Sequence, residues 1–319
     1  MITSTNLNIT WYLEKMIGLL ETSPLENQFQ DYIIYPVIES VLNSSEVNDI
    51  ELIDCHNFAQ YNTSSHNRCR YSVLVRAVPD LLLAKDFFYY NRDSGENNAP
   101  YEALNPIAAV EVKVPNSREM QIISGKSLYS NALYKEILPT LFKCGKYILT
   151  NVRRWDFFDS SRIDNAHLLN DISEYMNILE LCGFDNATDY STVIVKDKKD
   201  KKPKADVLER KWNEAVVFAN KYEQIAEIIK REKRPSKGAF NKILNAADSI
   251  FEQQIKEYVD ASLDSSRSVD IVNNPGFLSV DRHRSPSSYI TSVSDIQYDA
   301  NALNELFTKL NSFIFNTEE

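Results

Sequence analysis

The stretch Ala108-Ala109-Val110-Glu111-Val112-Lys113-Val114 decides which fold the sequence predicts. Its β-branched and small apolar residues are typical of a strand buried inside a sheet. Successive side chains of a strand point to opposite faces, so Glu111 and Lys113 share one face and the three valines fill the other. Burying an acid and a base is costly unless something uses them. We expect these side chains to serve a bound divalent cation.

A second stretch is expected to bring another carboxylate to the same place. Pro79-Asp80 precedes the apolar run Leu81-Leu82-Leu83-Ala84, which reads as a neighbouring strand. Proline is tolerated at the start of a strand, where no ladder hydrogen bond is lost. We therefore predict that Asp80 joins Glu111 and Lys113.

The composition argues against several classes of protein. The chain has 319 residues and a formal net charge of −10, which does not suit a protein that coats nucleic acid through bulk positive charge. It has no apolar run of about 18 residues, so no membrane span is expected. No GxGxxG or GxxxxGK[ST] motif occurs, so neither a dinucleotide fold nor a P-loop NTPase is expected. Four cysteines without CxxC spacing, and a start unlike a signal peptide, predict a reduced, cytoplasmic protein.

The periodicity predicts a mixed α/β core followed by helices. The expected strands are residues 71–76, 78–84, 107–114, 146–150 and 155–159. The expected helices are residues 9–43, with a second start near 23–26, then 126–143, 168–182, 206–231, 240–259 and 302–315. A helix between two adjacent strands implies a crossover, so the strands at 107–114 and 146–150 should pair in parallel. We expect a core over residues 1–160 and a mainly helical accessory region over 161–319, with a Ser/Asp/Asn-rich linker at about 261–299.

The two motifs resemble the PD-(D/E)xK nuclease superfamily. The matching residues are Val78-Pro79-Asp80 and Glu111-Val112-Lys113. Their order is similar to that of the N-terminal nuclease domains of bacterial restriction-modification enzymes, which have an early helical glutamate and a later strand ending in Thr-Asn. The corresponding stretches here are Glu26, Tyr147-Ile148-Leu149-Thr150-Asn151 and Trp155-Asp156-Phe157-Phe158. The resemblance covers about residues 10–160.

This resemblance implies a restriction-endonuclease-like mixed sheet flanked by helices. It also implies a Mg²⁺-dependent (or Mn²⁺-dependent) DNA endonuclease of a restriction or phage-defence system. Asp80, Glu111 and the carbonyl of Val112 would hold the metal. Glu26 would act through water or on a second ion, and Lys113 would position or deprotonate the attacking water.

One feature of the family has no clear counterpart in this chain. Many members carry a glutamine on the helix that follows the lysine motif. Gln121 precedes the expected helix, and Ser130 or Asn131 are the other candidates for that place.

DNA is the expected partner. Arg153 and Arg154, which follow a strand, and Lys199 and Lys202, in the basic run 196–204, are candidates to contact phosphates. The basic run reads more simply as a solvated surface loop. No methylase or helicase motif occurs, so recognition would come from the helical region, a partner subunit or a further domain. A homodimer is left open.

Four other interpretations stay open. Glu111 and Lys113 would also suit a solvent-facing strand. A nuclease fold that has lost activity would bind nucleic acid or a protein without cutting, and RNA would serve as substrate for the same motif. A zinc site would have its ligands at Cys55, His56, His66 and Cys69. Because Cys55 and His56 are adjacent in the chain, they are awkward ligands for one ion.

Overall fold

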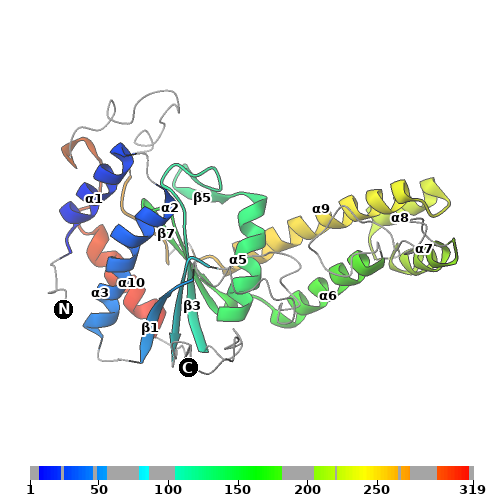
Figure 1. Cartoon of the computed structure of the whole chain (residues 1–319), viewed down its shortest axis with the longest axis horizontal. Coiled ribbons are helices and arrows are strands. Elements are labelled where there is room, and N and C mark those ends of the chain that lie inside the picture. The colour runs from blue at the N-terminus through cyan, green and yellow to red at the C-terminus, as the bar shows by residue number, and fades with distance from the viewer. Residues whose placement is uncertain are drawn as a thin grey trace, which may run out of the picture. The chain divides into compact units, whose positions relative to one another are not determined.

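The computed structural model describes residues 7–22, 25–45, 49–55, 79–85, 105–181, 205–219, 221–264, 267–273 and 293–315. The chain divides into two compact units (Figure 1). The sheet unit takes in the described residues up to Arg162 and those from Ala261 onwards. The helical unit takes in the described residues from Ile163 to Asp260.

A mixed sheet of six strands forms the centre of the sheet unit, in the order β1-β2-β3-β6-β7-β8. These strands are β1 (Ile50–Asp54), β2 (Leu81–Lys85), β3 (Asn105–Val112), β6 (Lys146–Thr150), β7 (Arg154–Asp159) and β8 (Val269–Asp270). β3 and β6 are parallel, and the other neighbouring strands are antiparallel. The expected mixed α/β architecture and the parallel pairing are thereby confirmed. The strand expected over residues 71–76 lies outside the described residues.

One face of the sheet packs on an apolar core. Its inward residues come from alternate positions of each strand, among them Val110, Val112, Trp155 and Phe157. They contact helices at both ends of the chain: α1 (Ile9–Glu21), α2 (Glu26–Phe29), the π-helix η1 (Gln30–Ile34), α3 (Tyr35–Ser44) and α10 (Ala302–Phe315). In Figure 1, α1, α3 and α10 lie on one side of the sheet and α5 (Asn131–Cys144) lies on the other.

A β-hairpin and α5 cover the opposite face. The hairpin consists of β4 (Met120–Ile123) and β5 (Lys126–Tyr129). The Tyr129 ring contacts Phe158 of β7, with ring centroids 5.8 Å apart, and Tyr134 of α5, at 5.6 Å. Residues 126–129 are therefore a strand and not the first turn of the expected helix. The helix starts at Asn131, where the Ser130 hydroxyl caps it by accepting a hydrogen bond from the Leu133 N–H at 3.2 Å.

The C-terminal part of the chain differs from the expected accessory region. β8 pairs with β7, and α10 packs its buried leucines into the core of the sheet unit. Described residues from 261 onwards thus complete the core of the sheet unit. In α10 the apolar side chains recur at the spacing of one helix face, and this face packs on the core. Of the expected linker at about 261–299, residues 265–266 and 274–292 lie outside the described residues.

Among its described residues the helical unit has four helices: α6 (Asn165–Leu181), α7 (Ala205–Ala219), α8 (Glu223–Glu232) and α9 (Lys237–Ser262), of which the last two residues belong to the sheet unit. Tyr175 of α6 stacks on Phe251 of α9, with ring centroids 4.2 Å apart. The single helix expected over 206–231 is divided between α7 and α8, with Tyr222 at the start of the second. None of the described helices has the length and apolar character that a membrane span requires.

Candidate active site

The register of the sheet places the predicted motif residues on one face. Leu81 pairs with Val110 and Leu82 with Ala109, so the same register sets Asp80 opposite Glu111. Residues directly opposite in an antiparallel pair have Cβ atoms about 5 Å apart. This face is the one that α5 and the hairpin cover, away from the apolar core.

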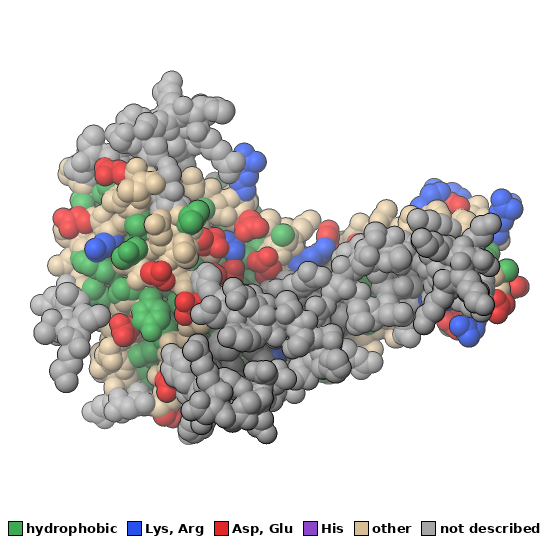
Figure 2. Space-filling view, viewed as in Figure 1, with side chains coloured by type: hydrophobic (Ala, Val, Ile, Leu, Met, Phe, Trp, Pro, Cys, Tyr) green, Lys and Arg blue, Asp and Glu red, His purple; other side chains and the backbone are tan. Residues whose placement is uncertain are grey.

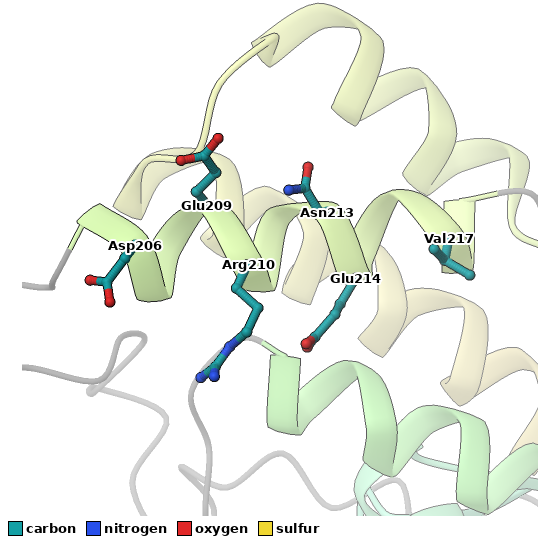
Figure 3. A pocket seen from close by; sticks show the side chains of 6 residues that line it. All are labelled: Asp206, Glu209, Arg210, Asn213, Glu214 and Val217. Atoms are coloured by element: carbon teal, nitrogen blue, oxygen red, sulfur yellow. The ribbon is translucent and has the colours of Figure 1, made fainter.

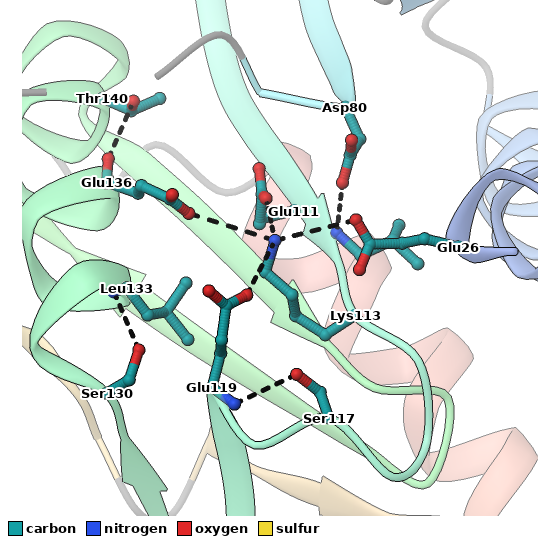
Figure 4. A network of polar contacts seen from close by, with 11 residues as sticks. Glu26, Asp80, Glu111, Lys113, Ser117, Glu119, Ser130, Leu133, Glu136 and Thr140 are labelled. Carbon is teal, nitrogen blue, oxygen red and sulfur yellow. Dashed lines mark hydrogen bonds and ion pairs between the residues drawn. The ribbon is translucent and has the colours of Figure 1, made fainter. Parts of the chain in front are cut away.

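Asp80 is directed toward β3. Its Oδ2 accepts a hydrogen bond of 2.7 Å from the backbone N–H of Val112 (Figure 4). The Val112 side chain itself lies in the core on the other face. The structure therefore brings Asp80, Glu111 and Lys113 together, as the sequence predicted.

Lys113 lies at the centre of the site, and its side chain is buried. Its Nζ is 2.5 Å from Glu111 Oε1 and 3.8 Å from Glu26 Oε1. Two further carboxylates approach it, Glu119 at 3.7 Å and Glu136 at 3.9 Å (Figure 4). The backbone N–H of Lys113 donates to the Thr150 carbonyl at 2.7 Å, which extends the pairing of β3 with β6. The ammonium is thus held by the sheet and surrounded by acids.

The charges in the site do not balance. Four carboxylates lie 2.5–3.9 Å from the Lys113 ammonium, those of Glu111, Glu119, Glu26 and Glu136. Asp80 lies opposite Glu111, so the site holds five carboxylates and one ammonium, a formal excess of four negative charges. Burial raises the pKa of Glu111, and the charge of Asp80 raises it further against the attraction of Lys113. Burial likewise raises the pKa values of Glu26 and Glu136. A further positive charge would be stabilised here.

The pKa of Lys113 is shifted in the opposite sense to what burial alone would give. Burial favours the neutral amine and lowers the pKa. The charge and hydrogen bond of Glu111, with smaller contributions from Glu26 and Glu136, outweigh this and raise it. Lys113 is therefore an ammonium at neutral pH.

Glu26 is positioned by an irregular helix. The Gln28 side chain accepts a hydrogen bond of 3.1 Å from the Leu25 N–H at the start of α2. Further along, Pro36 has no N–H to donate to a preceding carbonyl, and the chain bonds Tyr35 N–H to the Gln30 carbonyl in a π-helical turn. The helical path continues through the proline, and α2 contacts β3.

Two of the site carboxylates were not anticipated from the sequence. Glu119 immediately precedes β4, and Glu136 lies on α5 beside the buried Ile137. A hint was available, since Glu136 falls one residue from the apolar stripe of its helix. The three earlier candidates for a polar helix residue do not take this place. Ser130 caps α5, and Gln121 and Asn131 are exposed.

The donor set suits a hard divalent cation. Mg²⁺ and Mn²⁺ prefer oxygen ligands, and all of these side-chain donors are carboxylates. Within the described residues, no three His, Cys, Asp or Glu side chains are close enough to one another to hold an ion as they stand. The Lys113 ammonium lies between the carboxylates (Figure 4). The chemistry of the donors fits a cation that would share this space with Lys113.

Of the four residues predicted to contact nucleic acid, the structure describes Arg153 and Arg154. Arg154 is buried, and its guanidinium binds Asp156, Asp270 and the Gly125 carbonyl, so it does not offer the expected phosphate contact. Arg153 is buried as well, at 7 % exposure. Arg154 is the first residue of β7, whose residues up to Phe158 are buried. Lys199 and Lys202 lie outside the described residues.

Arg154 belongs to a second polar cluster on the same sheet face. Its Nε donates to Asp156 Oδ1 at 2.8 Å, and the Tyr129 hydroxyl donates to Asp156 Oδ2 at 2.7 Å. Glu111 pairs with Leu149, and Leu149 with Asp156, so the two clusters lie on one line across the sheet. The second cluster joins β7 to the hairpin.

No zinc site can be assigned from the described residues. Cys55 is buried, and burial raises the pKa of its thiol. His56, His66 and Cys69 lie outside the described residues.

A hollow also occurs in the helical unit, along α7 (Figure 3). It is lined by Asp206, Glu209, Arg210, Asn213, Glu214 and Val217. These side chains leave a single helix in different directions and do not converge (Figure 3). The convergent charges of the sheet unit are the stronger candidate for chemistry.

Comparison of the chain with protein-family models, with curated proteins and with solved structures finds no match in any of the three.

Proposed function

We propose that this chain is a divalent-metal-dependent nuclease that hydrolyses phosphodiester bonds of DNA, acting as an endonuclease in restriction or phage defence. The observation that carries the proposal is the meeting of Asp80, Glu111 and Lys113 on one sheet face with three additional carboxylates. The order of the two motifs, their strands and the flanking helices supports a restriction-endonuclease-like fold as part of the same proposal.

Asp80, Glu111 and the Val112 carbonyl would hold the metal, with Glu26 close enough to Lys113 to support them. A bound divalent cation would lower the pKa of a water molecule and offset the charge of the transition state. Lys113 supplies a positive charge that would bind a phosphate oxygen and orient the attacked phosphorus. Glu119 and Glu136 keep this ammonium in place from the hairpin and α5 sides.

Cleavage of supercoiled plasmid tests the proposal. The wild type, Lys113→Ala and Asp80→Asn are incubated with Mg²⁺, Mn²⁺ or EDTA, and a panel of DNA and RNA oligonucleotides fixes the substrate class. Lys15→Ala is the matched control, because Lys15 is an exposed lysine of α1. We expect metal-dependent cutting by the wild type and the control, and rates at least about 100-fold lower in both site variants. Equal cutting by Lys113→Ala, folded as judged by its urea midpoint, would refute the proposal.

The alternative is a nuclease-fold subunit that binds nucleic acid or a protein without cutting. One observation favours it: the Lys113 ammonium already neutralises part of the carboxylate charge, at 2.5 Å from Glu111. A protein that binds duplex DNA but cuts neither DNA nor RNA with any divalent metal would establish this alternative.

A further inference from the structure

The β4–β5 hairpin is a two-stranded ribbon beside the candidate active site. Gln121 pairs with Leu128 and Ile123 with Lys126. The turn between the strands has positive φ at both Ser124 (51°) and Gly125 (75°), as a two-residue hairpin turn of type I′ requires. The ribbon is therefore short and tightly turned.

The two faces of the ribbon differ in exposure. Met120 is buried, and Tyr129 of the same face packs against Phe158 of the sheet. The other face consists of Gln121, Ile123, Lys126 and Leu128, all exposed. Ile123 is 52 % and Leu128 48 % exposed, so this face presents two large apolar side chains to solvent.

Buried charged groups fix this ribbon to the central sheet. Arg154 Nη1 donates to the Gly125 carbonyl at the turn, at 2.7 Å, and the Tyr129 hydroxyl donates to Asp156. A backbone bond from Ser130 N–H to the Glu119 carbonyl, 2.8 Å, closes its base. These bonds anchor the turn and the base of the ribbon to the sheet unit.

The ribbon is continuous with the candidate active site. Glu119, whose carboxylate approaches Lys113, directly precedes β4 (Figure 4). A substrate lying across Lys113 would therefore meet the ribbon next.

The charge of this segment suits an anionic partner. In Figure 2, acidic side chains are prominent over the visible described surface of the sheet unit, in keeping with a chain of net charge −10. Residues 120–135 contain no Asp or Glu, and Lys126 lies on the exposed face. Arg118, just before the ribbon, is also exposed. Lys126 pairs directly with Ile123 across the ribbon.

We propose that the exposed face of the β4–β5 ribbon lies in a groove of double-stranded DNA next to the scissile phosphate. The major groove admits a two-stranded β-ribbon. Arg118 and Lys126 contact phosphates, Gln121 hydrogen-bonds to a base edge, and Ile123 and Leu128 make apolar contacts in the groove. This inference rests on the proposed function, in that it names the substrate of that site as duplex DNA and the element that reads it.

Equilibrium binding of a fluorescent 30-bp duplex in EDTA tests the ribbon without cleavage. We compare Ile123→Ser/Leu128→Ser and Arg118→Ala/Lys126→Ala with the wild type. The matched controls are Val216→Ser/Val217→Ser, exposed apolar residues of α7, and Lys15→Ala. We expect the apolar variant to bind at least about 10-fold more weakly with an unchanged salt dependence. The cationic variant should also lower the slope of log K against log salt by about 0.9 for each lost phosphate contact.

The outcomes separate this inference from the proposed function. Ribbon variants that bind like the wild type, while the wild type cuts in a Lys113-dependent way, overturn the inference and leave the function standing. Weakened binding in the ribbon variants, with no cutting by any protein, supports the inference and overturns the function. A wild type that binds no duplex, either in EDTA or with a divalent cation present, overturns the inference.

Discussion

Removing the Asp156 carboxylate should destabilise the sheet unit and loosen the hairpin together. Asp156 is fully buried and accepts from Arg154 Nε at 2.8 Å and from the Tyr129 hydroxyl at 2.7 Å. In Asp156→Ala the Arg154 guanidinium keeps Asp270, at 3.2 Å, as its remaining carboxylate partner in this cluster. The hairpin loses its tie through Tyr129.

The size of the effect follows from which groups lose partners. Breaking a buried ion pair by removing one partner typically costs about 3–5 kcal/mol. Because Asp270 still compensates part of the Arg154 charge, we expect about 3 kcal/mol for Asp156→Ala. Tyr129→Phe removes one hydrogen bond to a charged acceptor and should cost about 2 kcal/mol.

The loss of unfolding free energy is measured by urea denaturation followed by tryptophan fluorescence. The measurement uses a Trp212→Phe background, so that the signal comes from the tryptophans of the sheet unit, including the buried Trp155. Arg162→Ala is the control, because its pair with Asp264 is partly exposed and should contribute less than about 1 kcal/mol. Hydrogen exchange of residues 120–129 should accelerate in Asp156→Ala. A loss below about 1 kcal/mol, with unchanged exchange, would refute the reasoning.

Three further outcomes are expected. The hydrogen bond from Lys221 lowers the pKa of Glu174, so this interaction stabilises the helical unit above the unfolded pKa of about 4.3 and is lost as the pH falls through the lower folded value. The difference in urea midpoint between wild type and Glu174→Gln should therefore shrink between pH 6 and pH 3, and a constant difference would contradict the assignment. Because Glu111 would be a ligand of the ion, Mn²⁺ should raise the urea midpoint of the wild type but not that of Glu111→Gln, and an equal rise in both proteins would contradict this role. Ser124→Asn places the preferred Asn-Gly pair in the turn with Gly125 and should raise the midpoint slightly, whereas a lower midpoint would argue against the type I′ turn.

The alternation of side chains made the centre of the site predictable. In β3, a period of two separates Glu111 and Lys113 from Val110 and Val112, and the structure keeps that separation. The position of Asp80 was predictable because the apolar run that follows it was expected to form the neighbouring strand. These inferences needed only local pattern and one strand pairing.

Contacts between segments far apart in the chain could not be predicted from the periodicity of the sequence. Glu136 reaches Lys113 because α5 crosses from β3 to β6, and no spacing in the sequence gives that orientation. Residues 126–129 carry helix-compatible side chains, and a four-residue strand is too short for periodicity to separate it from a helix. The C-terminal strand β8 pairs with β7 across more than a hundred residues, which also lies outside what periodicity reports.

The alternation of side chains along β3 has a consequence for molecules that misfold. Were β3 to pair one residue out of step, Glu111 and Lys113 would turn into the apolar layer beneath α1, α3 and α10, and two valines would face the carboxylates. Each ion buried in this way would cost several kcal/mol, a large share of the stability of an ordinary domain. Misaligned chains should therefore stay unfolded and be removed by proteolysis, and nearly every molecule that completes its sheet should present its acids correctly.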